Sequence, residues 1–489
     1  MQSAANYMNP DPLQHARTLV VGLGVTGLSC ARFLARRGVE VAVTDSREQP
    51  PALAAMQQEL PDIALFLGGF DSDAFARAQR IVVSPGVSLQ EPLLLAARRR
   101  GVEVIGDIEL FARVATAPVI AVTGSNGKST VTTLVGAMAR RAGKDVRVGG
   151  NLGVPALDLI QEQEPDLYVL ELSSFQLESV SSLRACAATV LNISADHLDR
   201  YDSLASYARA KQQIYRGAAV QVVNRDDPLA CALADASGAM TGFTLQQPGG
   251  GDFGVSVAGN AGWIAKGSEG WLQVAEVRMP GRHNLANALA ALALGEAAGL
   301  PRPAMLQVLR EFQGLPHRTQ WVGEYQGVRW FNDSKGTNIG AALAAIQGFD
   351  GPLILIAGGR GKGADFRQLA EGMDDRVKAV VLLGDVGQGQ EEPEPADDGA
   401  VLVGREARPN GAAQIVAADR IAGDHLLKRQ ASRGRFPVEH DHAVAGGRTR
   451  GTRQRSRADR CQPHTHQLLP AIHAKRTCLP EATSTERWG

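Results

Sequence analysis

A short loop of glycines, hydroxyl residues and one lysine has the composition of a polyphosphate-binding site. Its members are Gly124, Ser125, Asn126, Gly127, Lys128, Ser129 and Thr130. The glycines let backbone N–H groups approach phosphate oxygens, and the Lys128 ammonium can reach the β- and γ-phosphates. The hydroxyl of Ser129 or Thr130 can bind Mg²⁺. The loop therefore predicts a nucleoside polyphosphate site, and the alternative is a glycine-rich turn with an exposed lysine.

The residues on either side of this loop predict the strand and helix that phosphate binding requires. Val119 to Val122 have the length and β-branching of a buried parallel strand. From Ser129 onward, apolar residues recur at helical spacing until Gly143 ends the helix. Val122 stands where the general NTPase loop has its first glycine, so this loop is a shorter form.

Two more polar residues follow strands expected in the same sheet. Leu167 to Leu170 would bring Glu171 to a strand's carboxyl end, and Ala187 to Leu191 lead toward His197. A carboxylate beside a phosphate loop can hold Mg²⁺, which makes Glu171 a metal-ligand candidate and His197 a candidate for a second metal. The alternatives are a solvated glutamate at a helix start and a surface histidine.

The N-terminal region contains a second glycine loop. An expected strand, Thr18 to Val21, precedes Gly22-Leu-Gly-Val-Thr-Gly27, a helix ending at Arg37 and a strand from Val39 to Thr44. This βαβ pattern is typical of dinucleotide binding, with Asp45 placed to reach a ribose hydroxyl. NAD is the default ligand, so a nucleotide-dependent dehydrogenase is one alternative and a tightly packed turn is another.

Polar residues also follow expected elements farther along the chain. The start of an alanine-rich helix after Pro280 could offer His283, Asn284 and Asn287 to a base or ribose. Two loops that follow strands, Asn332 to Asn338 and Gly358 to Asp365, combine lysine with polar or acidic neighbours. Such loops are expected to contact carboxylates and phosphates. Lys211 lies on an expected helix, where composition alone indicates a solvated lysine.

Length and composition favour an α/β protein of about three domains. The 489 residues include 51 Lys and Arg and 51 Asp and Glu, so no net charge favours nucleic acid or membrane. The five cysteines are scattered without a CxxC pair, which argues against disulfides or zinc and favours the reducing cytosol. No apolar run approaches the roughly 20 residues of a membrane span. We expect a cytoplasmic protein that binds neither nucleic acid nor membrane.

These motifs, in this order, resemble the Mur ligase family of ATP-dependent amide-forming enzymes in peptidoglycan precursor synthesis. The resemblance covers about residues 17 to 385 and rests on Thr123 to Ser129, Glu171 to Glu178, Asn192 to Tyr201, His283-Asn284, His317-Arg318 and Asn332 to Lys335. It implies that D-glutamate is added to UDP-N-acetylmuramoyl-L-alanine through an acyl phosphate, with release of ADP and phosphate. It also implies two Mg²⁺ ions and a UDP ligand in place of NAD. A monomer is expected, and a catalytically impaired nucleotide-binding remnant is the alternative.

The resemblance implies three α/β domains and a role for each. A Rossmann-like domain, 1–107, would bind the UDP substrate; a central P-loop-type ATPase domain with a parallel sheet, 108–314, would bind ATP; and a Rossmann-like domain, 315–489, would bind the amino acid. Contacts to the UDP substrate would come from Val25, Thr26, Asp45, Ser46, Arg47, Gly86, Asn151 and His197. Contacts to D-glutamate would come from Thr337 and Lys362.

The family pattern further implies ATP, metal and catalytic residues. The ATP contacts would be the loop from Gly124 to Thr130 together with Asn284, Asn287, Arg318, Asp333 and Lys335. Ser129 and Glu171 would hold the first Mg²⁺, while His197 and a carbamylated Lys211 would hold the second. Lys128, His197 and Lys211 would be the catalytic residues.

The chain after about Asp385 departs from this pattern. We find no convincing strand there, and 6 of the 10 histidines and an Arg-Gly-rich run, Gly446 to Cys461, lie in this tail. A Ser-Pro-Ala-x-Ala-Ser-Phe-Asp stretch of the family's D-glutamate site is absent. We therefore expect residues 386–489 to be non-native or disordered because the reading frame is lost. A basic tail for nucleic acid or for an acidic surface is the alternative.

Overall fold

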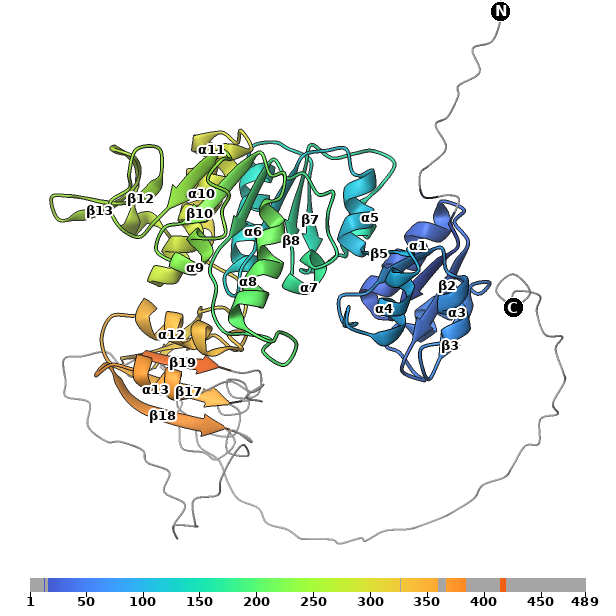
Figure 1. The fold of residues 1–489 in the computed structure, drawn as a ribbon. Coiled ribbons are helices and arrows are strands. Elements are labelled where there is room, and N and C mark those ends of the chain that lie inside the picture. Colours follow the sequence, from blue (N-terminus) through green and yellow to red (C-terminus); the bar gives the residue numbers. More distant parts are fainter. Residues whose placement is uncertain (1–12, 14–15, 326, 359–365, 384–413, 419–489) are drawn as a thin grey trace, which may run out of the picture. The chain divides into compact units, whose positions relative to one another are not determined.

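The structure is a computed structural model, and it describes residues 13, 16–325, 327–358, 366–383 and 414–418 (Figure 1). The described residues form three sheets, each dominated by parallel strands and accompanied by helices. Each sheet follows the previous one in the sequence, so the α/β class and the order of domains expected from the sequence are confirmed.

The first sheet is fully parallel and contains five strands in the order β3-β2-β1-β4-β5. The strands are β1 (Thr18–Val21), β2 (Val41–Asp45), β3 (Ala64–Leu67), β4 (Arg80–Val83) and β5 (Glu103–Gly106), and the helices are α1 (Val25–Arg36), α2 (Leu53–Glu59), α3 (Ser72–Arg77) and α4 (Pro92–Arg99). Strand order reverses at β1, so the loop after β1 lies at the switch point where open α/β sheets bind ligands.

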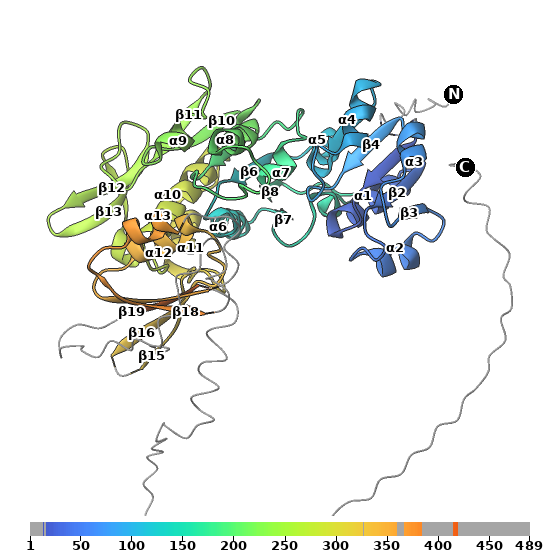
Figure 2. The same cartoon turned by 60° about the horizontal axis from the view of Figure 1, so that its bottom comes forward.

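The central sheet contains nine strands in the order β14-β13-β12-β11-β10-β9-β6-β8-β7. Its parallel strands are β6 (Val119–Thr123), β7 (Val146–Gly150), β8 (Leu167–Glu171), β9 (Ala187–Val190), β10 (Val220–Asn224) and β11 (Met240–Phe243). An antiparallel meander follows, made of β12 (Phe253–Ala258), β13 (Ala261–Lys266) and β14 (Glu269–Gln273), and β12 and β13 project from the sheet in Figure 2.

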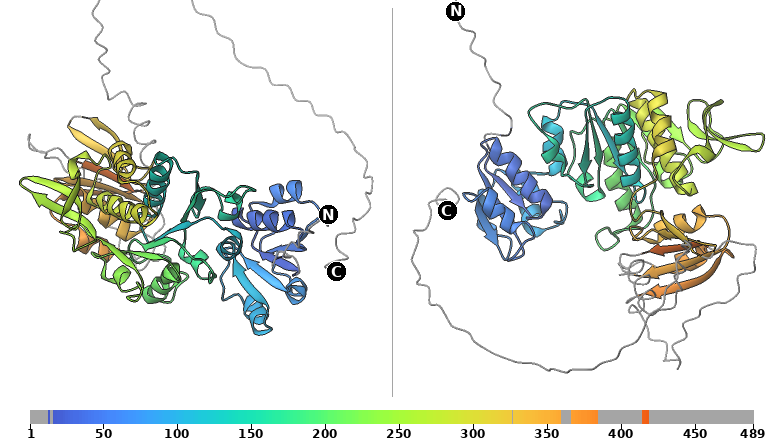
Figure 3. Two further views of the ribbon diagram at one scale, coloured as in Figure 1. Left: turned by 90° about the horizontal axis from the view of Figure 1, so that it is seen from above. Right: turned by 180° about the vertical axis from the view of Figure 1, so that it is seen from behind.

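Several helices pack around the central sheet. They are α5 (Asp107–Val114), α6 (Lys128–Arg141), α7 (Ser174–Leu177), α8 (Leu204–Gln212), α9 (Pro228–Cys231), α10 (Arg282–Ala297) and α11 (Arg302–Glu311), with single 3₁₀ turns at Ala156–Leu159, Gln213–Tyr215 and Val274–Glu276. The small alanine side chains of α10 are buried, and α10 and α11 pack beside α6, as Figure 3 shows. This packing buries the helix that follows the phosphate loop, and it fixes the position of that helix against the sheet.

The third sheet has the order β15-β16-β19-β17-β18. Its strands are β15 (Gln320–Tyr325), β16 (Val328–Asn332), β17 (Leu353–Gly358), β18 (Val377–Leu383) and β19 (Gln414–Ala418), with helices α12 (Ile339–Gly348) and α13 (Arg367–Gly372). β15 pairs antiparallel with β16, and the other pairs are parallel.

The strand β19 corrects the expectation that no strand follows Asp385. It pairs in parallel with both β16 and β17, so it is the middle strand of the third sheet. Its sequence, Gln-Ile-Val-Ala-Ala, is too short and too isolated to be recognised by periodicity, because its pairing partners lie far away in the sequence. The other residues of the tail, and the expected loss of the reading frame there, lie outside the described residues. Among the described helices, none is long and apolar enough to cross a membrane.

Candidate nucleotide and metal site

The phosphate loop joins the buried strand β6 to the N-terminus of α6. Gly127 caps α6 in the left-handed region with φ 84°, and a Cβ there would lie 2.4 Å from Asn287 Oδ1. Gly124 has φ 153°, and a Cβ there would lie 2.9 Å from Leu191 Cβ. Both positions therefore require glycine for reasons of backbone conformation and space. The resulting loop presents the positive end of the α6 dipole to a ligand.

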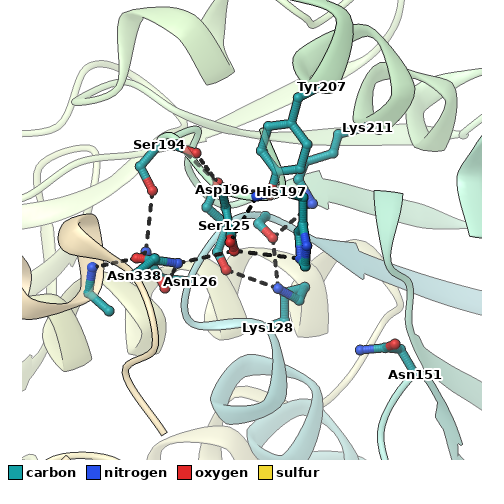
Figure 4. Close-up of polar contacts among 12 residues, drawn as sticks. Ser125, Asn126, Lys128, Asn151, Ser194, Asp196, His197, Tyr207, Lys211 and Asn338 are labelled. Atoms are coloured by element: carbon teal, nitrogen blue, oxygen red, sulfur yellow. Dashed lines mark hydrogen bonds and ion pairs between the residues drawn. The ribbon is translucent and has the colours of Figure 1, made fainter. Parts of the chain in front are cut away.

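Two lysines converge on the backbone of this loop (Figure 4). Lys128 Nζ donates hydrogen bonds to the carbonyl oxygens of Gly124 and Ser125, both at 2.9 Å. Lys211 Nζ donates to the same Gly124 oxygen at 3.0 Å and to Thr123 Oγ1 at 3.3 Å. The two amino groups thus share one carbonyl oxygen, although 83 positions separate them in the sequence (211 − 128 = 83).

Burial changes the acid–base properties of both lysines. Lys211 is 1% exposed, and burial followed by the charge of Lys128 holds the pKa of Lys211 well below its usual value. Burial also lowers the pKa of Lys128. At a given pH, a larger fraction of Lys211 is therefore in the neutral amine form than of a solvated lysine. The interpretation of Lys211 as solvated is wrong.

Glu171 offers an unsatisfied carboxylate oxygen at the carboxyl end of β8. Its side chain is buried, and its Oε1 accepts a hydrogen bond from Asn151 Nδ2 at 2.7 Å. Its Oε2 has no hydrogen-bond partner among the described residues. A buried, unpaired carboxylate oxygen is costly unless a cation or a donor meets it. The residue therefore fits a metal ligand, and the interpretation as a solvated glutamate is wrong.

Ser129 and His197 both lie between Lys128 and Lys211 in the sequence, and each has its own contacts. Ser129 Oγ accepts a hydrogen bond from Arg318 Nη2 at 2.9 Å. His197 has φ 54°, its ring packs edge-to-face on Phe175 with centroids 4.8 Å apart, and its Nε2 lies 3.7 Å from Asp196 Oδ2. Within the described residues, no group of three or more His, Cys, Asp or Glu could hold a metal ion. Any metal here would therefore also need serine, modified lysine, phosphate or water ligands.

A cavity of about 270 Å³ adjoins the phosphate loop. Predicted ATP residues that line it are Asn126, Gly127, Thr130, Asn284, Asn287, Arg318 and Asp333. Asn284 Nδ2 donates to Pro280 O at 2.7 Å, and Asn287 Nδ2 donates to Asn284 Oδ1 at 3.2 Å. Asp333 Oδ1 accepts from Thr319 N at 2.8 Å, while burial raises the pKa of Asp333 to about 6. Lys335 is exposed and does not line this cavity.

Several contacts in this region, and Tyr207 as a member of it, were not predicted by the sequence analysis. Asn126 and Asn338 exchange side-chain hydrogen bonds at 3.2 Å, and Asn338 also donates to Asp196 Oδ2 at 3.2 Å. Tyr207 lies with its hydroxyl 3.2 Å from Ser125 Oγ and its ring centroid 4.6 Å from Lys211 Nζ (Figure 4). The four-residue spacing of Tyr207 and Lys211 on α8 could have indicated the second contact. No local pattern connects Asn126 with Asn338.

A second cavity, of about 600 Å³, gathers the predicted UDP-substrate residues. Its lining includes Val25, Thr26, Asp45, Ser46, Arg47, Gly86 and Asn151, but His197 is not part of it. Predicted D-glutamate residue Thr337 is exposed, and Lys362 lies outside the described residues.

Both carboxylate oxygens of Asp45 accept hydrogen bonds from other groups of the protein. It accepts hydrogen bonds from Leu23 N at 2.6 Å, from Arg47 N at 2.9 Å, and from the Arg47 guanidinium at 2.7 and 2.8 Å. Burial alone would raise the pKa of Asp45, but these hydrogen bonds outweigh burial and lower the pKa to about 2. Asp45 therefore organises the loop and Arg47, whereas the NAD interpretation requires its oxygens to be available to a ribose.

Family models of known proteins match three successive parts of the chain. Residues 16–106 match the Mur ligase MurD-like N-terminal domain, residues 122–295 the Mur ligase middle domain, and residues 317–435 the Mur ligase glutamate ligase domain. The third match extends past residue 385, in agreement with the position of β19 in the sheet.

Curated relatives and solved structures that are similar to this chain can also be named. A UDP-N-acetylmuramoylalanine--D-glutamate ligase of Nitrosococcus oceani is 56% identical over 379 residues, covering 76% of this chain and 84% of the relative. The protein of the same name from Pseudomonas aeruginosa is 52% identical, covering 75% and 82%. The structure of the UDP-N-acetylmuramate-alanine ligase MurC of Thermotoga maritima matches with a TM-score of 0.48 and 18% identity, covering 86% of this chain and 100% of that one.

Proposed function

The chain belongs to the Mur ligase family, and from this premise we propose that it joins D-glutamate to UDP-N-acetylmuramoyl-L-alanine at the expense of ATP. The observation that carries the proposal at the site is that Lys128 and the buried Lys211 share the Gly124 carbonyl oxygen, together with the unpaired oxygen of Glu171. A lysine beside the phosphates, a lysine that can become a metal ligand and a metal-binding carboxylate suit transfer of the ATP γ-phosphoryl group.

The chemistry joins a carboxylate to an amine. The substrate carboxylate attacks the γ-phosphorus of ATP, the bond to the bridging oxygen breaks, and an acyl phosphate and ADP form. The amine of D-glutamate then attacks the acyl carbon, phosphate leaves, and the amine loses a proton, so that the products are the amide, ADP and phosphate. The first step brings two anions together, and Lys128 and Arg318 would lower this repulsion.

Two metal positions are proposed around the loop. Ser129 and Glu171 would hold one Mg²⁺, and His197 with Lys211 would hold the other; the ions would neutralise phosphate charge. For Lys211 to become an anionic ligand, its neutral amine would add to CO₂ and release a proton, forming a carbamate. The lowered pKa of Lys211 supports this step, because only the unprotonated amine is a nucleophile.

The remaining contacts are proposed from the family pattern, and two cavities could hold the nucleotide parts of the ligands. ATP would occupy the cavity beside Gly127, with Asn284 and Asn287 near its base and Asp333 and Lys335 near its ribose and phosphates. The UDP substrate would occupy the cavity formed by Val25, Thr26, Asp45, Ser46, Arg47, Gly86 and Asn151. D-glutamate would contact Thr337 and Lys362.

The domain roles and the cellular setting belong to the same proposal. Residues 1–107 would bind the UDP substrate, 108–314 would bind ATP, and the domain that begins at 315 would bind D-glutamate. We propose a cytoplasmic monomer. The alternative is an impaired remnant of the family, which the absence of the Ser-Pro-Ala-x-Ala-Ser-Phe-Asp stretch from the tail favours.

Phosphate release measured with defined substrates tests the function. Full-length protein is supplied with ATP, Mg²⁺, UDP-N-acetylmuramoyl-L-alanine and D-glutamate, and each component is omitted in turn. The ligase requires that release depends on both the UDP substrate and D-glutamate and that the amide product accumulates in equal amount. Binding of ATP and UDP substrate without release would establish the impaired remnant instead.

A further inference from the structure

Asp107 is a buried carboxylate that has no role in the chemistry above. It is the first residue of α5 and is 2% exposed. Its Oδ2 accepts a hydrogen bond from Gln176 Nε2 at 2.8 Å, but its Oδ1 has no hydrogen-bond partner among the described residues. Burial raises the pKa of Asp107 to about 6, against the lowering effect of its hydrogen bonds. Keeping an ionised group at such a position costs folding free energy, so packing alone does not explain it.

The partner of Asp107 connects the UDP-substrate cavity to the turn beside Glu171. Gln176 lies on α7 and contributes to the lining of the 600 Å³ cavity. Its Oε1 accepts a hydrogen bond from Ser173 N at 3.1 Å, and Ser173 Oγ accepts one from Gln176 N at 3.2 Å. This pair of bonds closes the turn that begins two residues after Glu171.

The hydrogen bonds of Gln176 determine which way its amide points. Ser173 donates to the oxygen and Asp107 accepts from one N–H, and the second N–H has no partner among the residues that the structure describes, so it is available to a ligand in the cavity. An ionised carboxylate can only accept, so it selects the NH₂ end of the amide. An asparagine at position 107 could donate as well, and it would no longer distinguish the two ends.

We propose that Asp107 is a positioning residue that holds Gln176 with an N–H directed to an oxygen of the UDP substrate. Asp107 itself does not line the cavity and acts only through Gln176. The inference rests on the proposed function, because it requires the UDP substrate to occupy this cavity.

Glu109, on the same helix, provides a matched control. It is 1% exposed, and its carboxylate accepts hydrogen bonds from Ser181 N at 2.7 Å and from Ser182 N at 2.9 Å. Burial would raise the pKa of Glu109, but these bonds and those of Ser182 Oγ and Arg113 lower it to about 2. Glu109 and its partners do not line the substrate cavity. It is therefore a buried carboxylate that stabilises the fold without reaching the site.

The test compares Asp107→Asn with Glu109→Gln in the full-length protein. Calorimetric titration measures the dissociation constants of UDP-N-acetylmuramoyl-L-alanine and of ATP, and thermal unfolding measures stability. Asp107→Asn should weaken binding of the UDP substrate roughly tenfold, leave ATP binding unchanged and leave the unfolding temperature unchanged or higher. Glu109→Gln should show the reverse pattern, with a lower unfolding temperature and unchanged affinity for the UDP substrate.

A second background tests whether Asp107 acts through Gln176. Gln176→Met should weaken UDP-substrate binding by a similar factor, and adding Asp107→Asn to it should cause no further loss. Additive losses, or an unchanged affinity in either single variant, would overturn the inference while the proposed function stands. If Asp107→Asn does not fold, an unchanged affinity of Gln176→Met would still overturn the inference, because the N–H that Asp107 is proposed to direct would then contribute nothing to binding. Failure of the unaltered protein to bind the UDP substrate would instead contradict the proposed function and the inference with it.

Discussion

The two glycine loops of this chain have equivalent positions in their sheets, but the charged side chains beside them are paired differently. Each follows a buried parallel strand and opens a helix at the carboxyl edge of a sheet. Beside the first loop, the carboxylate of Asp45 is paired within the protein, because it accepts hydrogen bonds from the Arg47 guanidinium and from two backbone N–H groups. Beside the second, within the part of the chain that the structure describes, Lys128 and Lys211 donate hydrogen bonds only to neutral oxygens, and one oxygen of Glu171 has no partner.

This difference suggests a division of work between the two loops. A region whose charges are already paired changes little when a ligand arrives, which suits recognition of a fixed substrate. A region with buried, unpaired charges is destabilised until ligands and metal ions complete it, and such a region can favour a transition state. The predictions below test this division.

The largest effect is expected for Lys128→Ala. Removal of the ammonium leaves the transferred phosphoryl group without its point charge, so ATP turnover should fall by about a thousandfold or more. The affinity for UDP-N-acetylmuramoyl-L-alanine should stay within about twofold, because the cavities proposed for the two ligands are lined by different residues. Phosphate release and calorimetric titration measure the two quantities. Retained turnover would show that the loop does not serve ATP.

Lys211→Ala should also abolish turnover, but the loss should be partly reversible. A short carboxylate such as formate or acetate could enter the space left by the side chain and replace a carbamate as metal ligand. We expect recovery of a few per cent or more of the original rate, and none when Lys128→Ala receives the same additive. If an intact, folded Lys211→Ala protein shows no rescue at any carboxylate concentration, the carbamate proposal is wrong.

Asp45→Asn should have an intermediate effect that depends on pH. The pKa of Asp45 is about 2 in the folded protein and about 3.9 in an unfolded chain, so its contribution is complete above pH 4 and disappears as the pH falls toward 2. The substitution should lower the free energy of unfolding by about 1 to 2 kcal/mol at neutral pH. Denaturant titrations at pH 7 and pH 3 should show this difference shrinking at the lower pH. An equal difference at both would contradict the assignment.

The smallest effect on stability is expected for Arg47→Ala. The Arg47 side chain is 52% exposed, so its ion pair with Asp45 is screened by solvent and contributes about 0.5 kcal/mol or less. Affinity for the UDP substrate should fall more noticeably, by roughly tenfold, because Arg47 lines the cavity. A loss of stability as large as that of Asp45→Asn would show that the ion pair with Arg47, and not the backbone hydrogen bonds, carries most of the contribution of Asp45.

The sequence analysis predicted those elements and residues that depend on patterns among neighbouring residues in the chain. The strand before each glycine loop, the helix after it and the carboxylate at the end of β8 follow from apolar runs, glycines and strand ends. Boundaries differ by one or two residues, as for β2, which begins at Val41 where the pattern predicts Val39. The motifs that resemble a known family supplied most of the residue roles.

Contacts between distant segments could not be predicted in this way. The pairs Asn126 and Asn338, Lys211 and Gly124, and Asp107 and Gln176 are each brought together by the fold. None has a periodic or compositional pattern, because such patterns report only neighbours on one helix or strand. Lys211 shows the consequence: its sequence context resembles a solvated helix position, but packing against Tyr207 and the phosphate loop buries it.

The position of β19 has a consequence for how the chain is made. During synthesis on the ribosome, β16, β17 and β18 emerge before the strand that joins β16 to β17. A nascent chain that ends before Gln414 can form the hairpin of β15 and β16 and the pair of β17 and β18, but these halves have exposed edges toward each other. Folding of this sheet is therefore completed late in translation, and a stalled or truncated chain would present two open strand edges to other proteins.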